Sequence, residues 1–414
     1  MGAEHAMQGT KARAGWRLAL LSGLGLAALL AGPRPARAAD EPPPPPVTVS
    51  VRDTFDLWRN ASGGVDTGNV VLNKLQLSAT LRPKPFGLDG LRLHAQIFVT
   101  NGPSLSEKVG DVQTVSNIEA PTMARLFEAW AEQAFGKEDA GGGEIRAGLI
   151  DLNSEFDSID PASLLINSSQ GIGPDLSKSG RNGPSIFPVS SLGMTGQWTP
   201  SGALALHAGV FDGLPGDPAH PRRFVAAHLG GGAGALLIAQ ADVKPAKDLQ
   251  ISFGAWRYTA DLRVIGGGGA KQADSGLYGF VEGPLPHVSH WSGWVRVGAS
   301  QGAVQTVSAY AGAGVIGKSG RKDDTIGFAI AHAIIGDPSR RLGLPSAETT
   351  FEATYQTSVA DHLAIQPDLQ YVIHPAGRPG LPNAFVMGLR LVFHEQYPGR
   401  KGRASDYDAT VAPD

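Results

Sequence analysis

The chain has 414 residues and no cysteine. This absence excludes a disulfide scaffold, a thiolate metal site and a cysteine nucleophile. After the N-terminal region, the sequence also lacks any uninterrupted apolar stretch of the ~20 residues that a transmembrane helix requires. If the chain enters a membrane, it must therefore do so through strands.

An excess of positive charge is also absent, because the formal net charge is −3. Residues 1–38 contain five of the 35 bases and one of the 38 acids, so the remainder carries 30 bases and 37 acids, a charge of −7. Proteins that bind nucleic acids usually carry the opposite sign. We therefore expect no nucleic-acid partner.

The N-terminal region has the three parts of an export signal. Lys11, Arg13 and Arg17 precede an apolar run from Leu18 to Leu30, and Ala36-Arg37-Ala38 supplies the small residues that a signal peptidase recognises. A retained membrane anchor is the alternative, but the run is shorter than the ~20 residues of a span. The sequence predicts a signal peptide over residues 1–38 and a proline-rich periplasmic spacer over residues 39–46.

The first prediction concerns the start of the exported protein. The Ala36-Arg37-Ala38 site places the mature N-terminus at or within about two residues of Ala39. The intact mass of the exported protein measures this position directly. A mass that still includes residues 1–38 would contradict the prediction.

From Val47 onward, hydrophobicity alternates with period two, as expected of strands with one apolar face. From Leu91 to Val99 the odd positions are apolar and most even positions are polar. Similar segments continue to Phe393, and their even number is typical of bacterial barrels. We predict an all-β fold, a transmembrane antiparallel β-barrel over residues 47–393. Its strands, about sixteen, are expected at 47–59, 70–82, 91–101, 123–135, 144–150, 189–199, 203–211, 233–243, 248–259, 275–283, 288–300, 304–315, 325–333, 348–358, 362–373 and 384–393.

A secreted soluble β-sandwich that binds or cleaves glycans is the alternative, because its strands alternate as well. Three observations favour the barrel. Many apolar positions are Ala, such as Ala239 and Ala311, which lipid tolerates better than a dry core does. Connections alternate between short turns and long loops. Aromatic residues near strand ends suggest interfacial girdles, namely Phe55, Trp58, Phe211, Tyr258, Trp291, Tyr371 and Phe393.

One segment matches a nucleotide-binding pattern. Residues Gly312 to Ser319 satisfy the Walker A spacing, but this chemistry needs a parallel strand before the loop and a helix after it. Here another alternating segment follows, so we interpret the match as a loop at the barrel mouth. No G-x-S-x-G or H-E-x-x-H motif occurs. We expect no enzyme activity, no cofactor and no metal.

The segment 151–187 is long and has no regular pattern of its own. Such a loop in a compact protein usually has a function, and in a wide barrel an inward fold would narrow the pore. A plain outer loop is the alternative. The candidate constriction residues are Asp151, Asn153, Glu155, Asp157, Asp160 and Asn167.

Strand parity also predicts side chains that face the lumen. The candidates are Arg92, Gln96, Glu128, Trp130, Glu132, Arg146, Trp256, Arg296, Asp368, Gln370 and Arg390. Such side chains could select a passing solute by weak hydrogen bonds and by stacking on aromatic rings. A general or anion-specific porin is the alternative, but it would need an excess of Lys and Arg among these residues, and both signs are present.

Together, several segments in order resemble the carbohydrate-selective porin family, whose known members are the OprB porins. The resemblance covers roughly residues 69–393 and rests on Asn117–Glu119, Arg125–Gln133, Arg146–Phe156, Ile166–Ser169, Gly183–Pro188, Gly209–Gly213, Gly320–Arg321, Asp324–Gly327, Glu352–Tyr355, Gln366–Tyr371, Pro375 and Gly388–Arg390.

The resemblance implies a sixteen-stranded barrel in the outer membrane of a Gram-negative bacterium, through which mono- or oligosaccharides diffuse passively. The implied partners are these solutes, the lipid of the outer membrane and the barrel-assembly machinery, and the protein is a monomer or a trimer. One feature departs from the family, whose chains usually end on an aromatic residue in the last strand. Here a polar C-terminal tail, residues 394–414, follows Phe393.

Overall fold

The computed structural model describes residues 45–398 except 138–140, 228–231, 233, 322–323, 338–346 and 379. The predicted signal peptide, most of the predicted spacer and most of the predicted tail lie outside the described residues. No helix in the described part of the chain is long and apolar enough to cross a membrane.

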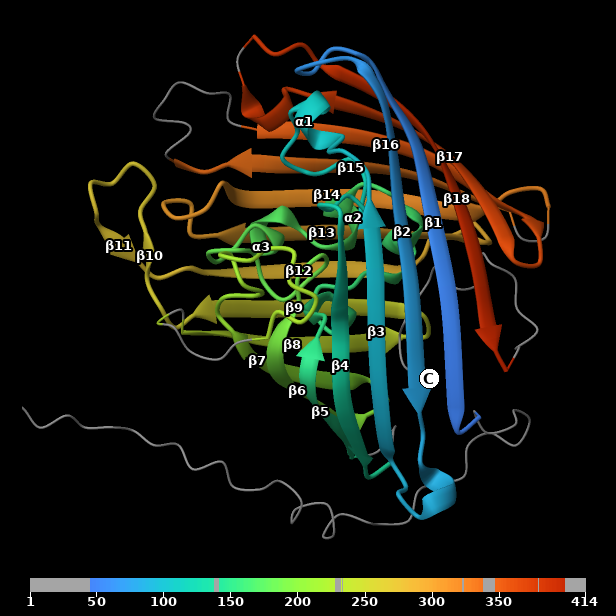
Figure 1. Cartoon of the computed structure of the whole chain (residues 1–414). Helices are drawn as coiled ribbons and strands as arrows, with labels where there is room; N and C mark the ends of the chain where they lie inside the picture. The colour runs from blue at the N-terminus through green and yellow to red at the C-terminus, as the bar shows by residue number, and fades with distance from the viewer. Residues whose placement is uncertain are drawn as a thin grey trace, which may run out of the picture.

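Sixteen antiparallel strands form a closed barrel, as the sequence predicts (Figure 1). Each strand pairs with its neighbours in the chain order, and β1 pairs with β18 to close the circle. The bounds are β1 (Val47–Ser62), β2 (Gly68–Leu81), β3 (Leu91–Asn101), β4 (Met123–Phe135), β5 (Gly142–Ile150), β6 (Ser191–Ser201), β7 (Leu204–Asp212), β8 (Ala235–Ala246), β9 (Leu249–Tyr258), β12 (Ser275–Pro284), β13 (Trp291–Ser300), β14 (Val307–Lys318), β15 (Thr325–Ile335), β16 (Ala347–Ala360), β17 (Leu363–Ile373) and β18 (Ala384–Tyr397).

Two details differ from the expectation. β18 continues beyond Phe393 to Tyr397, because the first residues of the tail still alternate and pair with β1 from Val49 onward. A small hairpin, β10 (Leu262–Arg263) and β11 (Lys271–Gln272), forms within the loop that connects β9 to β12. It projects beyond the barrel mouth in Figure 1.

The strands present apolar side chains outward and mostly polar ones inward. On β3, for example, Leu93 and Val99 are exposed while Arg92 and Gln96 are buried. This alternation follows from strand geometry, in which successive side chains point to opposite faces. An exposed apolar outer wall is what a barrel needs where it meets lipid.

The prediction of interfacial girdle residues was wrong for three of the seven. Trp58, Phe211 and Tyr258 are almost fully buried and belong to apolar clusters inside the barrel, because they share the parity of the inward side chains. Phe55, Tyr371 and Phe393 are exposed on the outer wall. Position near a strand end therefore does not by itself place an aromatic side chain at the interface.

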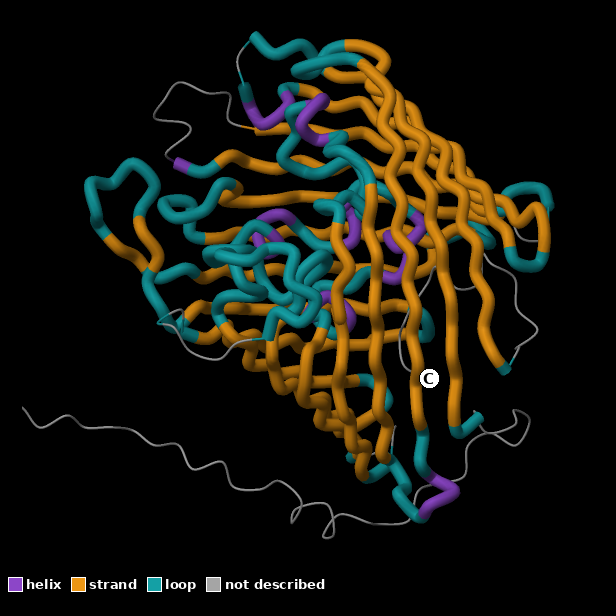
Figure 2. The backbone as a smooth tube through the Cα atoms, in the orientation of Figure 1, coloured by secondary structure: helices purple, strands orange, loops and turns teal. Residues whose placement is uncertain are grey.

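The connections at the two barrel ends differ in length, in line with the predicted alternation. Short turns join β2 to β3, β6 to β7 and β8 to β9 at one end, which we call the short-turn end. The opposite end carries the long connections, including residues 102–122 and 151–190. Both of these fold back into the barrel, where Figure 2 shows their short helical turns surrounded by strands.

The Walker-type residues form part of the wall and do not form a mouth loop. Gly312 to Lys318 lie in β14, which pairs antiparallel with both β13 and β15. A Cβ at Gly312 would collide with the Tyr310 ring, and one at Gly314 with Trp294, so these glycines leave room for aromatic side chains. The residues lack the parallel strand and the helix that a phosphate-binding loop requires.

The second prediction follows from this placement. Replacing Lys318 with Ala should leave barrel folding and conductance nearly unchanged, because Lys318 is an exposed residue at the end of a wall strand. ATP should bind neither protein in equilibrium dialysis. Saturable nucleotide binding that disappears in the Lys318→Ala variant would contradict this interpretation.

Candidate functional site

Residues 151–190, which we call the constriction segment, leave β5 at the long-loop end and lie inside the barrel (Figures 1 and 2). Their tight turns are capped by their own polar side chains. Asp151 accepts from the Asn153 N–H at the start of η2 (Leu152–Ser154), and Asn167 accepts from the Ser169 N–H at the start of α2 (Ser168–Gly171). Such side-chain caps define the backbone where no long helix or strand does.

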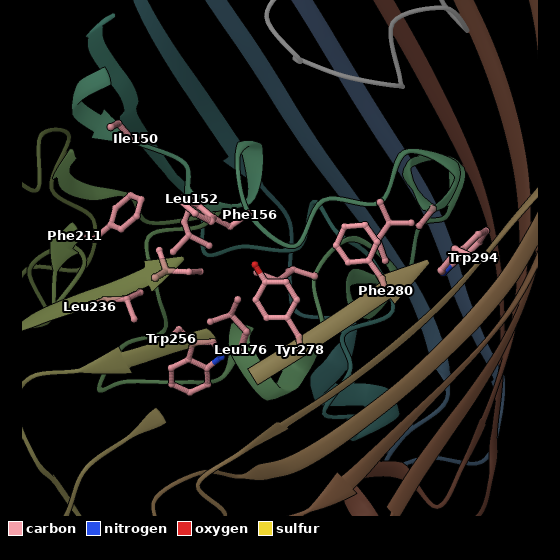
Figure 3. Packing of buried hydrophobic residues seen from close by; sticks show 14 of the residues in the cluster. Ile150, Leu152, Phe156, Leu176, Phe211, Leu236, Trp256, Tyr278, Phe280 and Trp294 are labelled. Atoms are coloured by element: carbon pink, nitrogen blue, oxygen red, sulfur yellow. The ribbon is translucent and has the colours of Figure 1, made fainter. Parts of the chain in front are cut away.

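An apolar core fixes the constriction segment against one side of the wall. In Figure 3, Leu152, Phe156 and Leu176 of the segment lie among Tyr278, Phe280 and other wall residues. Further members of this cluster are Ile159, Leu165, Phe211, Leu236, Trp256, Tyr258 and Trp294. Because these surfaces are removed from water together, burial holds the segment inside the lumen.

The strongest polar anchor is Arg296 on β13, which is only 2% exposed. Its guanidinium group donates to both carboxylate oxygens of Asp157 at 2.9 and 2.7 Å, and it also donates to Asp175. The rings of Tyr278 and Tyr310 lie 5.4 and 5.2 Å from the guanidinium carbon. One wall cation therefore holds two carboxylates of the constriction segment, in the bidentate geometry that favours Arg.

A second anchor connects the segment to β4 and β5. Arg146 contacts Glu155 of the segment at 2.6 Å and Glu132 of β4 at 2.8 Å. Arg92 on β3 donates to the same Glu132. The constriction segment is thus tied by ion pairs to opposite parts of the barrel wall.

Several other candidates form hydrogen bonds with one another or with the wall. Gln96 donates to Glu128 at 3.1 Å, and Gln370 donates to Asp368 at 3.0 Å. Arg390 on β18 donates to Asp56 on β1 at 2.7 and 2.9 Å. All eleven candidates are buried, and these contacts brace the inner side of the wall.

Trp130 and Trp256 do not offer the free stacking surfaces that the sequence suggested. The Trp130 ring stacks on His94 with centroids 4.9 Å apart and lies 4.2 Å from the Arg146 guanidinium carbon, and it is only 8% exposed. Trp256 is 3% exposed within the apolar cluster. Neither ring is therefore open for a solute to stack on it.

Parity alone would have found several partly exposed polar residues that the candidate list omits. Arg52 on β1, Lys74 on β2 and Arg82 directly after β2 face the lumen, as do His207 on β7 and Gln250 on β9. They lie at intermediate exposure, so they are more accessible to a solute than the buried candidates. The even positions of β2 already alternate with apolar odd positions in the sequence, and this is the signal that identifies Lys74 and Arg82.

The six candidate constriction residues have different surroundings. Asp157 and Asn167 are fully buried, whereas Asp160 is exposed at the start of η3 (Asp160–Leu164). Burial and, to a lesser extent, the nearby Glu128 carboxylate raise the pKa of the Asp151 carboxyl to about 7. Both surroundings disfavour the charged form of this carboxyl.

A second inward segment was missed by sequence reasoning. Residues 102–122, which we call the entry segment, connect β3 to β4 and bury Leu105, Val109 and Val115 against the inner wall. Ser116 donates to Asp56 at 2.6 Å, and Asn117 accepts from Arg390 at 2.8 Å. Its length was visible in the sequence, but its composition resembles that of an outer loop.

Comparison with known proteins agrees with this architecture. A family model described as carbohydrate-selective porin, OprB family, matches residues 73–394. The high-pH structure of Pseudomonas putida OprB is similar with a TM-score of 0.73 at 18% identity, over 84% of this chain and 94% of that chain. The low-pH structure of the same protein has a TM-score of 0.52 at 15% identity, over 84% and 92%. A search among curated proteins gave no match.

The solved structures establish the shared barrel fold, and the family model spans most of the strands and both inward segments. The family and the fold are those of a channel through which solutes diffuse. The ordered motifs, the sixteen-stranded barrel and the family model agree, and the chain belongs to the OprB family of carbohydrate-selective porins.

Proposed function

We propose that the chain forms a passive pore for small neutral sugars in the outer membrane of a Gram-negative bacterium, with its short-turn end toward the periplasm. The constriction segment narrows the lumen, and partly exposed polar residues of the wall form weak hydrogen bonds with the passing solute. Sugar hydroxyls both donate and accept, so a mixed set of carboxylates, amides and guanidinium groups suits them. Each contact must be weak enough to release the solute again.

The observation that carries this proposal is the pairing of the lumen arginines. Arg146, Arg296 and Arg390 are each held by carboxylates at hydrogen-bonding distance. A guanidinium group that is already paired attracts a passing anion weakly, because its field is largely compensated. This arrangement favours neutral solutes over the anion-specific alternative.

The anchoring contacts also have a consequence for the oligomeric state. The groups that anchor the constriction segment come from one chain, so a monomer suffices for selective passage. We further propose that the barrel-assembly machinery recognises β18, the last strand, whose final residue is the aromatic Tyr397.

Liposome swelling with a panel of solutes tests the proposal. Liposomes that contain the folded protein should swell in neutral pentoses and hexoses, more slowly in disaccharides, and more slowly in a sugar acid than in its neutral parent. Liposomes with heat-denatured protein are the control. Faster entry of the sugar acid would support the anion-specific alternative, and a lack of swelling with folded protein would refute a sugar pore.

A further inference from the structure

We propose that the entry segment and the constriction segment behave as one body inside the barrel, and that Glu348 on β16 is its positioning residue. Glu348 would then affect sugar discrimination without touching the solute. This inference rests on the proposed function, because it concerns what sets the shape of the same pore.

Glu348 holds the entry segment through backbone amides. Its carboxylate accepts from the Val112 N–H at 2.9 Å and from the Gln113 N–H at 3.0 Å. It also accepts from the Ala376 N–H, in the loop between β17 and β18, at 2.5 Å. Glu348 is fully buried, so loss of its side chain would leave these buried N–H groups without a partner, which is costly.

The two inward segments are joined directly by hydrogen bonds. The Asn117 N–H donates to the Ile166 carbonyl, and the Ser168 N–H donates to the Thr114 carbonyl, both at 2.9 Å. The Ser169 hydroxyl donates to the Gln113 side-chain carbonyl at 3.0 Å. A displacement of either segment would break these buried bonds, so the two are expected to move together.

Alternate residues of β16 form hydrogen bonds with both inward segments. Thr350, the next inward position after Glu348, accepts from the Gln113 side chain at 3.3 Å. Glu352, one position further, accepts from the backbone N–H groups of Ile166 and Asn167 at 2.5 and 3.3 Å. A single strand therefore anchors the entry segment at one point and the constriction segment at the next.

The position of Glu348 makes the coupling testable. Among the described residues, its side-chain hydrogen bonds go to the entry segment and to Ala376, and none goes to residues 151–190. The entry segment, which bonds to both Glu348 and the constriction segment, is therefore the route by which we expect Glu348 to affect the constriction. A residue that only stabilised the barrel would leave the pore of the folded protein unchanged.

The experiment compares Glu348→Gln and Gln113→Ala with the wild-type chain in planar bilayers and liposome swelling. Glutamine keeps the shape of Glu348 but places an amide donor opposite the backbone N–H groups. Gln113→Ala keeps the backbone bond to Glu348 and removes the side-chain bonds that join the entry segment to Thr350 and to Ser169 of the constriction segment. Glu395→Gln on β18 is the matched control, since the Glu395 carboxylate pairs with His362 at 3.1 Å on the barrel surface. Heat-modifiable mobility confirms folding of each variant.

We expect both test variants to show roughly tenfold more frequent conductance fluctuations, which is the order expected for loss of a buried hydrogen bond, and weaker discrimination between small and larger sugars. Glu395→Gln should match the wild-type chain. In a variant that lacks residues 157–182, Glu348→Gln should have no further effect, because double-mutant effects vanish when the second change removes the shared target.

Two results would overturn the inference. One is wild-type discrimination in both folded test variants, and the other is a full additive effect of Glu348→Gln in the deletion background. If Glu348→Gln does not fold, Gln113→Ala still tests whether the two inward segments behave as one body, and Glu348→Asp, which keeps the carboxyl but shortens its reach, tests the positioning role. If the variant that lacks residues 157–182 has wild-type conductance, the proposed constriction itself is refuted. If that variant has altered conductance but Glu348→Gln behaves like the wild-type chain, only the inference about Glu348 is refuted.

Discussion

Deletion of residues 157–182 should raise single-channel conductance severalfold and flatten the discrimination between small and larger sugars. The segment fills one side of the lumen with the buried side chains of Figure 3, so its removal widens the narrowest part of the pathway. The conductance of a pore depends steeply on its narrowest cross-section and on the groups that line it.

The deletion should be compatible with folding because the ends of the segment are neighbours. The Leu152 N–H donates to the Ser185 carbonyl at 2.6 Å, and the Ser185 hydroxyl donates to the Ile150 carbonyl at 2.6 Å. Joining Phe156 to Gly183 therefore requires no long span. The strand hydrogen bonds of the barrel remain, and these satisfy the backbone in the membrane.

Planar-bilayer recordings and liposome swelling provide the two measurements, with heat-modifiable mobility as the test of folding. Deletion of residues 265–269 from the β10–β11 hairpin is a suitable control, because this hairpin projects away from the lumen in Figure 1. A folded variant without residues 157–182 but with wild-type conductance would show that the segment does not limit passage.

Replacement of Arg296 with Met should detach the constriction segment while the barrel stays folded. The change leaves the buried carboxylates of Asp157 and Asp175 without their cation. Removal of one partner from a buried ion pair typically destabilises the folded state by about 3–5 kcal/mol. We expect this cost to exceed the free energy that holds the short constriction segment in its place. The segment should then leave its place for a large fraction of the time.

The expected readouts are a noisy increase in conductance and faster proteolysis within residues 151–190. A triple variant, Arg296→Met with Asp157→Asn and Asp175→Asn, should recover much of the wild-type behaviour, because neutral replacement of a whole buried ion cluster is often tolerated. Wild-type conductance and protease resistance in the single variant would show that apolar packing alone holds the segment.

The barrel was predictable because its signal is local. Alternation within each strand depends on neighbouring residues only, so all sixteen strands were located from the sequence, with bounds that differ by a few residues. The same parity assigned Arg92, Arg296 and Gln370 to the inner side correctly. It would also have corrected Trp58, which shares even positions with the inward Asp56 and Asn60.

The interior was less predictable because its contacts are distant in sequence. Arg296 lies 139 positions from Asp157 and 121 from Asp175, and no spacing rule connects them. The length of the constriction segment indicated a function, but the length of the entry segment did not distinguish an inward from an outward loop. The covering of Trp130 by His94 and Arg146 likewise depends on packing between three strands.

The pairing of β1 with β18 has a consequence for how the protein reaches its folded form. Asp56 and Arg390 face each other across this seam although 334 positions separate them. Contacts of such long range form late, because closing a very large loop first costs conformational entropy. Until the last strand arrives, both edges of the nascent sheet stay open to wrong partners. Pairing of β1 with β18 is therefore the step that removes the open sheet edges and with them the risk of aggregation. The buried Asp56–Arg390 pair can form only at this step.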